Sequence, residues 1–174
     1  AVLLFYQGLR RIPNKTDSCW TDDLLAAPHG TRDKAVRVRN MFNAIAARYE
    51  LVNTVCSGGR DRYWRRQAAR LAKVTPGDRV LDVACGTGDF ARVFQGMGAG
   101  RTVGCDFARQ MLVRAVAADQ DSSIEWVEAD ALQLPFRDRT FSIVSCAFGV
   151  RNMQALDCGL SEMARVLRDG GRAV

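Results

Sequence analysis

The chain lacks any apolar run long enough to cross a bilayer, since even the stretch from Phe141 to Val150 falls far short of that length. It also lacks internal repeats and low-complexity segments. Its six cysteines form no C-x-x-C pair, so we predict no metal site. Cys85, Cys105 and Cys146 lie in or beside apolar segments, where a free thiol acts as a small hydrophobe. The cysteine pattern therefore favours free thiols in a reducing, cytoplasmic compartment over a framework of disulfide bonds.

The sequence does have the size and composition of one ordinary globular domain, with 174 residues, 48% hydrophobic and 25% charged. Residues 1–34 are predicted as an N-terminal extension, because their charges follow the apolar run instead of preceding it as in a signal peptide. The net charge is +6, and arginines cluster from Arg60 to Arg70 around Tyr63 and Trp64. We interpret this cluster as a solvated helix face, with an anionic membrane surface as the main alternative. No nucleic-acid partner is expected, and a homodimer is left open.

Two helices are predicted before residue 75, and together they would form a small helical cap over residues 35–74. In the first, apolar residues recur at intervals of three and four, the pattern of an amphipathic helix. The residues of that apolar face are Val38, Met41, Phe42, Ile45 and Tyr49. The second helix is predicted over 63–72, since the turn residues TPGD follow it.

Strand and helix patterns then alternate to the end of the chain. Short apolar runs predict strands over 79–84, 101–105, 124–128 and 141–148. Helical patterns lie over 89–97, 108–119 and 155–168. This alternation predicts an α/β fold over residues 75–174, a Rossmann-like doubly wound parallel sheet with helices on both faces.

The predicted sheet is incomplete at its end. A fifth strand would begin at Arg172 and include only three residues, which would leave strand 141–148 as a long, apolar, unpaired edge. We therefore expect the last strands to be missing and the sequence to be a piece of a longer enzyme.

A glycine turn, CGTGD, follows the first predicted strand, at the place where open α/β sheets bind ligands. Two ligand classes compete for it. Gly86, Gly88 and Ala91 also satisfy a dinucleotide fingerprint, and Asp106 lies at a suitable distance to bind a ribose. Asp89 argues against a pyrophosphate there, because two negative charges would repel each other. The ammonium and sulfonium groups of S-adenosylmethionine would instead be attracted, so we favour that cofactor.

Acidic residues also end the next two predicted strands. The Asp106 carboxylate can accept hydrogen bonds from both ribose hydroxyls, although it can also cap the helix that begins at about residue 108. Asp130 can accept from an adenine amino group while the Ala131 N–H donates to a ring nitrogen, and Phe107 can lie against the adenine. Asp82, inside the first strand, either supports the glycine turn or reaches the cofactor's ammonium through water.

The order of these motifs resembles that of class I methyltransferases, with LDVACGTGD followed by GCDFARQML and EADALQLPF. Further stretches are similar to the ubiquinone/menaquinone biosynthesis C-methyltransferases: YELVN from Tyr49, FGVRN from Phe148, and RVLRDGGRAV near the end. The resemblance extends from about residue 35 to the end. The chain departs from that family's pattern at Glu50, Asp61 and Asp169, where the family usually has aspartate, histidine and proline.

The resemblance implies a C-methyltransferase that acts on a prenylated quinol, either a benzoquinol or a naphthoquinol. It implies these contacts with S-adenosylmethionine: Gly86, Thr87, Gly88, Asp106, Asp130 and Ala131. It places Arg151 and Asn152 at the methyl-transfer site, where Arg151 would stabilise a developing phenolate. The one histidine, His29, lies outside the motifs, so histidine base catalysis has little support. A methyltransferase of another small molecule and a non-catalytic binding module are the alternatives.

The aromatic residues of the helical cap have two interpretations. Phe42, Tyr49 and Trp64 would cover the quinol ring and tail as a lid, or they would simply pack the cap. The sequence favours neither.

Overall fold

The computed structural model describes residues 34–49, 57–119 and 123–174. The predicted extension up to residue 33, together with His29 and Glu50, lies outside these residues. Among the described helices, none is both long and apolar enough to cross a membrane.

The centre of the molecule is a five-stranded, fully parallel sheet with the strand order β3-β2-β1-β4-β5. Its strands are β1 (Arg79–Val83), β2 (Arg101–Asp106), β3 (Ile124–Glu128), β4 (Phe141–Ser145) and β5 (Leu167–Ala173). All five residues of β4 are buried, as expected for a strand with both faces covered. The chain order reverses beside β1, so the carboxyl ends of β1 and β4 frame the ligand-binding edge.

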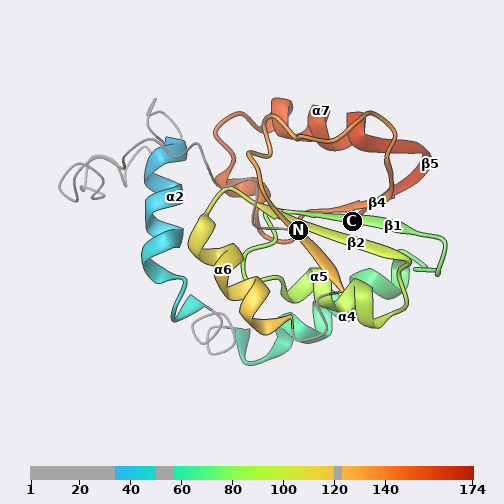
Figure 1. Ribbon diagram of the computed structural model, residues 1–174, viewed down its shortest axis with the longest axis horizontal. Coiled ribbons are helices and arrows are strands. Elements are labelled where there is room, and N and C mark those ends of the chain that lie inside the picture. Colours follow the sequence, from blue (N-terminus) through green and yellow to red (C-terminus); the bar gives the residue numbers. More distant parts are fainter. Residues whose placement is uncertain (1–33, 50–56, 120–122) are drawn as a thin grey trace.

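Helices cover both faces of the sheet and confirm the doubly wound arrangement (Figure 1). On one side lie α4 (Arg60–Leu71), α5 (Asp89–Gly96) and α6 (Arg109–Ala118), and on the other lies α7 (Leu156–Val166). Side chains alternate along β1, so Val80 packs with Phe94 beneath α4 and α5, whereas Leu81 packs with Met163 of α7.

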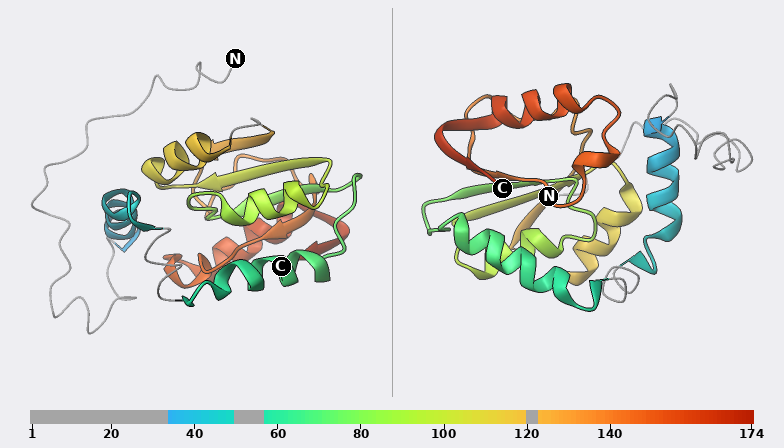
Figure 2. Two further views of the ribbon diagram at one scale, coloured as in Figure 1. Left: turned by 90° about the horizontal axis from the view of Figure 1, so that it is seen from below. Right: turned by 180° about the vertical axis from the view of Figure 1, so that it is seen from behind.

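Helix α4 belongs to the layer that covers the sheet. Its Ala69 and Ala72 are buried against Val80 and Phe94. Among the described residues of the range predicted as a cap, α2 (Lys34–Ile45) is the helix that lies outside the two helical layers, beyond the edge of the sheet and beside α6 (Figure 2).

Helix α2 is anchored by its first residue. Lys34 is buried, and its Nζ donates hydrogen bonds to the carbonyl oxygens of Arg151 (3.3 Å) and Met153 (2.7 Å). Val38 is buried as the periodicity predicts, but Ile45 is 40% exposed. The prediction failed at Ile45 because the side chains that pack against Met111 of α6 are those of Phe42, Ala46 and Tyr49, and Ile45 is not among them.

The prediction of an unpaired strand four was wrong. β5 begins at Leu167, not at Arg172, and it pairs with β4 through Phe141 opposite Leu167 and Ile143 opposite Arg172. The register shift between these pairs leaves an irregular segment that the sequence pattern did not indicate. The edge strand on this side is therefore β5, which is mostly exposed and polar, as edge strands often are.

Candidate active site

The chain leaves β1 through a turn with alternating left-handed residues. Ala84, Gly86 and Gly88 have φ angles of +54°, +58° and +87°. The turn is held from outside by Asp106, whose Oδ2 accepts a hydrogen bond from the Gly86 N–H at 2.8 Å. Helix α5 begins immediately afterwards, at Asp89.

The two glycines of this turn have different roles. Gly86 lines a cleft, as predicted. A Cβ on Gly88 would instead lie 2.2 Å from the Trp126 ring, which also crosses Gly104 of β2. The space left by the missing side chain of Gly88 is therefore filled by an indole. A pyrophosphate cannot occupy the space beside Gly88 that Trp126 fills, which adds a steric argument against a dinucleotide to the charge of Asp89.

Gly88→Ala is expected to destabilise the protein more than Gly98→Ala. Both glycines have φ near +88°, but nothing lies within 4 Å of a Cβ on Gly98. Gly98→Ala should therefore cost only about 1–2 kcal/mol of left-handed strain. Gly88→Ala should cost about 1–3 kcal/mol more, because Trp126 must move. Urea unfolding measures both variants, and equal free energies of unfolding would contradict the packing role.

Of the two functions that the sequence left open for Asp106, the structure shows the structural one, and the contact with a ribose stays a prediction. Besides holding Gly86, Asp106 accepts a hydrogen bond at Oδ1 from the Ala108 N–H at 2.8 Å, at the start of α6. The side chain is nearly buried, and burial raises its pKa despite these bonds. Each carboxylate oxygen has a further lone pair, so both can still accept from a ligand.

A cleft of about 740 Å³ opens to solvent at the carboxyl ends of the strands. Of the predicted residues, the cleft is lined by Gly86, Asp106, Phe107, Asp130, Ala131 and Asn152. Phe42 and Tyr49 close its outer side, with ring centroids 5.8 Å apart in an edge-to-face pair.

A smaller, more polar recess of about 350 Å³ lies beside the cleft and contains Asp82 and Thr87. Ser145 Oγ donates to Asp82 Oδ1 at 2.7 Å, and the Ala91 N–H lies near the carboxylate and lowers its pKa, whereas Oδ2 is buried and has no partner at hydrogen-bond distance among the described residues. Burial raises the pKa of this carboxyl to about 7. An unsatisfied, buried carboxylate oxygen is costly and calls for a donor from outside the chain.

The sequence analysis missed Arg65, which it treated as part of a solvated helix face. Arg65 is buried in the wall of the recess, and its Nη1 lies 2.5 Å from Asp61 Oδ2 and 3.9 Å from Asp89 Oδ2. Its guanidinium carbon lies 5.8 Å from the ring centroid of Phe148. The sequence did contain a sign of this ion pair, because Arg65 follows Asp61 by four residues and Asp61 is the one acidic residue of this helix.

Asp61 fixes the position of Arg65. Burial would raise the pKa of Asp61, but hydrogen bonds from Arg65 and from Ser57 Oγ (2.9 Å) outweigh it and lower the pKa. The carboxylate therefore stays ionised. Asp61 stands where the resembled family usually has histidine, so this buried ion pair is a feature of the present chain.

Asp89 is not the free anion that the sequence argument assumed. Its Oδ1 lies 2.7 Å from Arg92 Nη2, and the two form an ion pair on the first turn of α5. The repulsion expected between Asp89 and a bound phosphate is therefore weaker than predicted.

Three of the predicted residues lie outside the lining of both cavities. Gly88 is covered by Trp126, Trp64 is half exposed, and the Arg151 side chain is exposed on a short 3₁₀ helix, η2 (Val150–Asn152). Phe148, just before η2, has a φ of +64° and lines both cavities. The segment after β4 thus presents Phe148 and Asn152 to the cleft but not Arg151.

The thiols near the site are not nucleophiles. Burial raises the pKa of Cys85 and Cys105 well above the usual value, and that of Cys146 to about 12. They stay protonated at neutral pH, so their role is packing.

Sequence comparisons identify similar proteins. The chain is 49% identical over 146 residues to a demethylmenaquinone methyltransferase of Deinococcus radiodurans, covering 82% of this chain and 61% of that protein. It is 42% identical over 146 residues to the ubiquinone/menaquinone biosynthesis C-methyltransferase UbiE of Teredinibacter turnerae, covering 80% and 59%. The chain thus spans about three fifths of the length of these relatives.

Solved structures show the same fold. An S-adenosylmethionine dependent methyltransferase from Mesorhizobium loti superposes with a TM-score of 0.56 at 28% identity, over 62% of this chain and 50% of that one. A chain in the complex of the Haloferax volcanii Trm112 methyltransferase activator with a methyltransferase gives 0.65 at 28% identity, over 76% and 57%. These neighbours confirm the Rossmann-like, class I methyltransferase architecture.

The family follows from the sequence match. The ubiE/COQ5 methyltransferase family matches residues 30–174, which include the sheet, the cleft and the recess. Together with relatives above 40% identity, this match confirms the resemblance found in the motifs. The chain belongs to the ubiE/COQ5 methyltransferase family.

Proposed function

We propose that this chain forms the cofactor-binding and catalytic part of an S-adenosylmethionine-dependent C-methyltransferase that methylates the ring of a prenylated quinol. The observation that carries the proposal is a single cleft lined from the ends of four strands. β1 leads to Gly86, β2 ends at Asp106, β3 leads to Asp130, and β4 leads to Asn152. This arrangement brings cofactor and substrate groups to one edge of the sheet.

The cleft fits the nucleoside end of the cofactor. Asp106 would accept hydrogen bonds from the ribose hydroxyls, and Phe107 would pack against the adenine. Asp130 Oδ1 accepts from the Leu132 N–H at 2.9 Å, which orients the carboxylate and leaves Oδ2 to accept from the adenine amino group. The Ala131 N–H would donate to a ring nitrogen.

The recess fits the amino-acid end, which carries both an ammonium and a carboxylate. The unsatisfied Oδ2 of Asp82 is an acceptor for the ammonium, directly or through water. The buried guanidinium of Arg65 is a donor for the carboxylate, since Asp61 occupies only one side of its planar fork. Gly86 lines both cavities and would hold the cofactor where it passes from one to the other, and Thr87 would contact the part in the recess.

Cofactor binding should weaken as the pH falls through about 7, the raised pKa of Asp82. Below it the carboxyl is protonated and must lose its proton to bind an ammonium, which costs up to about tenfold in affinity per pH unit. Calorimetric titration with S-adenosylhomocysteine over this range measures the slope. The Asp82→Asn variant should bind S-adenosylhomocysteine more weakly than the parent at high pH, and its affinity should not depend on pH. Any pH dependence that remains in this variant would come from titration of the ligand itself. A wild-type affinity that does not change with pH would contradict the role of Asp82.

The transfer itself is mainly a problem of position. Bound S-adenosylmethionine supplies an electrophilic methyl group, and the protein must hold a ring carbon in line with it. Phe42, Tyr49 and Phe148 give the cleft an apolar wall suited to a quinol ring and the start of its tail. Asn152 would orient the ring oxygen, and Arg151 would stabilise the charge that develops when the hydroxyl loses its proton to water.

The substrate class is tested in cells. A strain that lacks its own quinone C-methyltransferase should regain methylated menaquinone or ubiquinone when it carries the complete gene, as measured by mass spectrometry of extracted lipids. The similar proteins are named for demethylmenaquinone and for both quinone pathways, so both ring types are assayed. If neither demethylated quinone is consumed although the protein binds S-adenosylhomocysteine, a different small-molecule substrate is indicated. The homodimer that the sequence leaves open stays a prediction.

A further inference from the structure

The charge of the chain is concentrated on the two helices that precede the sheet. The described residues of 34–49 and 57–72 contain nine basic residues and one acidic residue, Asp61. Asp61 is buried and paired with Arg65, so it contributes no negative charge to the surface. The exposed charge of these helices is therefore entirely positive.

On α4, the exposed arginines are accompanied by two exposed aromatic residues, and we call this set the basic face. It consists of Arg60, Arg62, Tyr63, Trp64, Arg66 and Arg70, all of them exposed. Tyr63 and Trp64 are 61% and 49% exposed, although aromatic side chains are usually buried.

The basic face is not explained by helix stability. Arg62, Arg66 and Arg70 follow one another at four-residue intervals, and like charges at this spacing destabilise a helix by roughly 0.2–0.5 kcal/mol per pair. A solvated face would be more stable with alternating signs. The arrangement becomes favourable when a negatively charged surface lies against it.

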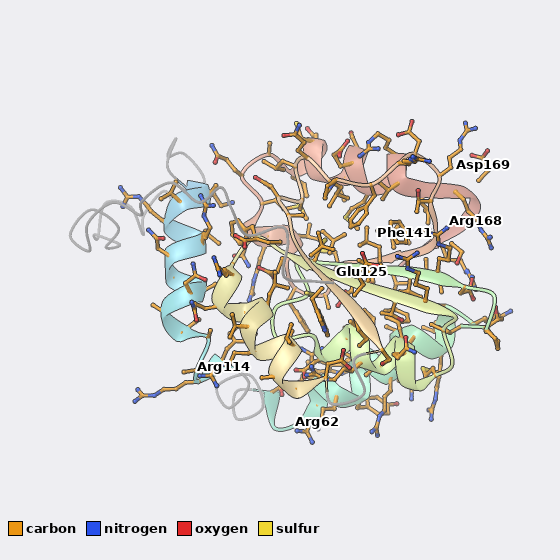
Figure 3. All side chains as sticks on the ribbon, in the orientation of Figure 1. Arg62, Arg114, Glu125, Phe141, Arg168 and Asp169 are labelled. Carbon is orange, nitrogen blue, oxygen red and sulfur yellow. The ribbon has the colours of Figure 1, made fainter. Side chains whose placement is uncertain are left out.

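The position of the basic face matters as much as its charge. Helix α4 ends at Leu71 and β1 begins at Arg79, so α4 runs antiparallel to β1 and starts at the carboxyl edge of the sheet. Arg65 confirms this direction, because it contacts Phe148 in the wall of the cleft. Arg62, Tyr63 and Trp64 therefore lie in the first turns of α4, near the carboxyl edge of the sheet, and Figure 3 shows Arg62 on the outer side of this helix, away from the sheet.

We infer that the basic face of α4 docks the protein on an anionic phospholipid surface, with Tyr63 and Trp64 at the lipid headgroups and the arginines on lipid phosphates. Arginine with tryptophan and tyrosine is the composition of interfacial helices. This inference rests on the proposed function, because a prenylated quinol is held in the bilayer by its tail. Docking near this edge of the sheet brings the mouth of the cleft close to the membrane surface.

Vesicle binding tests the inference without any enzymatic step. Co-sedimentation with phosphatidylglycerol vesicles should show binding that weakens with added salt, whereas phosphatidylcholine vesicles should bind far less. Each arginine near such a surface raises the partition coefficient onto the vesicles about fivefold. The double variant Arg62→Glu, Arg66→Glu should therefore have a partition coefficient at least about 25-fold lower than that of the parent. Trp64 fluorescence should shift to shorter wavelength on binding, and Trp64→Phe should lose that shift.

The matched control has the same change of charge at the other end of the molecule. Arg137 and Arg168 are exposed and lie by the start of β4 and β5, and Figure 3 shows Arg168 far from Arg62. Arg137→Glu with Arg168→Glu should bind vesicles within about twofold of the parent, because the basic face is intact. Circular dichroism and S-adenosylhomocysteine affinity confirm that both double variants are folded.

Even if phosphatidylglycerol vesicles bind the protein, three results would overturn the inference. They are equal binding to both lipids, an equal loss in the control variant, and tighter binding of a single-stranded oligonucleotide than of phosphatidylglycerol vesicles at the same salt. The proposed function fails separately. If vesicles bind as expected but no quinol is methylated, the docking surface stands and the substrate is wrong. If a short-tailed quinol is methylated but vesicles do not bind, the substrate stands and the docking surface is wrong.

Discussion

Arg151→Ala is expected to lower the turnover number about a hundred- to a thousandfold while the cofactor affinity stays within about twofold. An interaction formed mainly in the transition state affects turnover, whereas uniform binding affects the Michaelis constant. Arg151 lies next to Asn152 on η2, at the edge of the cleft, with its side chain exposed to solvent. From there its guanidinium would reach the ring oxygen only after the substrate is bound. The measurement is single-turnover methylation of a short-tailed demethylquinol by the complete protein, with saturating cofactor.

Arg151→Lys and Arg168→Ala complete that experiment. Lysine keeps the charge but not the planar fork, so it should recover only part of the rate. Arg168 is an exposed arginine away from the cleft, and its loss should leave the rate within about twofold. If Arg151→Ala retains a third or more of the parent rate, the residue is a surface arginine and takes no part in the transfer.

Asp106→Ala is expected to weaken S-adenosylhomocysteine binding by about 1.5–3 kcal/mol, or roughly 10- to 150-fold. The structure adds a second consequence, since Asp106 also accepts from the N–H groups of Gly86 and Ala108. Its loss leaves two backbone donors without their partner, so the free energy of unfolding should fall as well. Asp106→Asn keeps one carbonyl acceptor and should be the more stable of the two variants.

A modified ligand separates direct binding from the support of the turn. An S-adenosylhomocysteine analogue without the ribose hydroxyls should bind the parent more weakly, and Asp106→Asn should weaken it little further. If the variant instead weakens the analogue and the natural ligand by the same factor, Asp106 acts through the turn. That outcome would contradict the proposed contact with the ribose.

Much of the fold was predictable because its signals are local. The strand at 124–128 was predicted to the residue, and the strands that begin at Arg79, Arg101 and Phe141 were correct at their first residues. Apolar runs alternate with helical periodicity over short stretches, so each element is readable without knowing its neighbours. The carboxyl edge as the ligand site followed from the parallel sheet alone.

The errors concern features that depend on contacts distant in sequence. Strand 141–148 was predicted three residues too long, because Phe148 is apolar but takes a left-handed turn into the cleft. The pairing of β5 with β4 depends on a register shift that has no signal in the sequence.

The sequence by itself determined the family, the parallel sheet and the acids at the strand ends, because motifs and periodicity depend only on residues that are close together in the chain. Only the tertiary structure decided what surrounds each side chain. It separated Gly86, which faces the cleft, from Gly88, which faces Trp126. It divided the arginines of α4 into Arg65, buried beside the cleft, and the exposed arginines of the basic face. The physical reason is that burial and charge pairing are properties of three-dimensional neighbours, and residues of the same type can have opposite environments one helical turn apart.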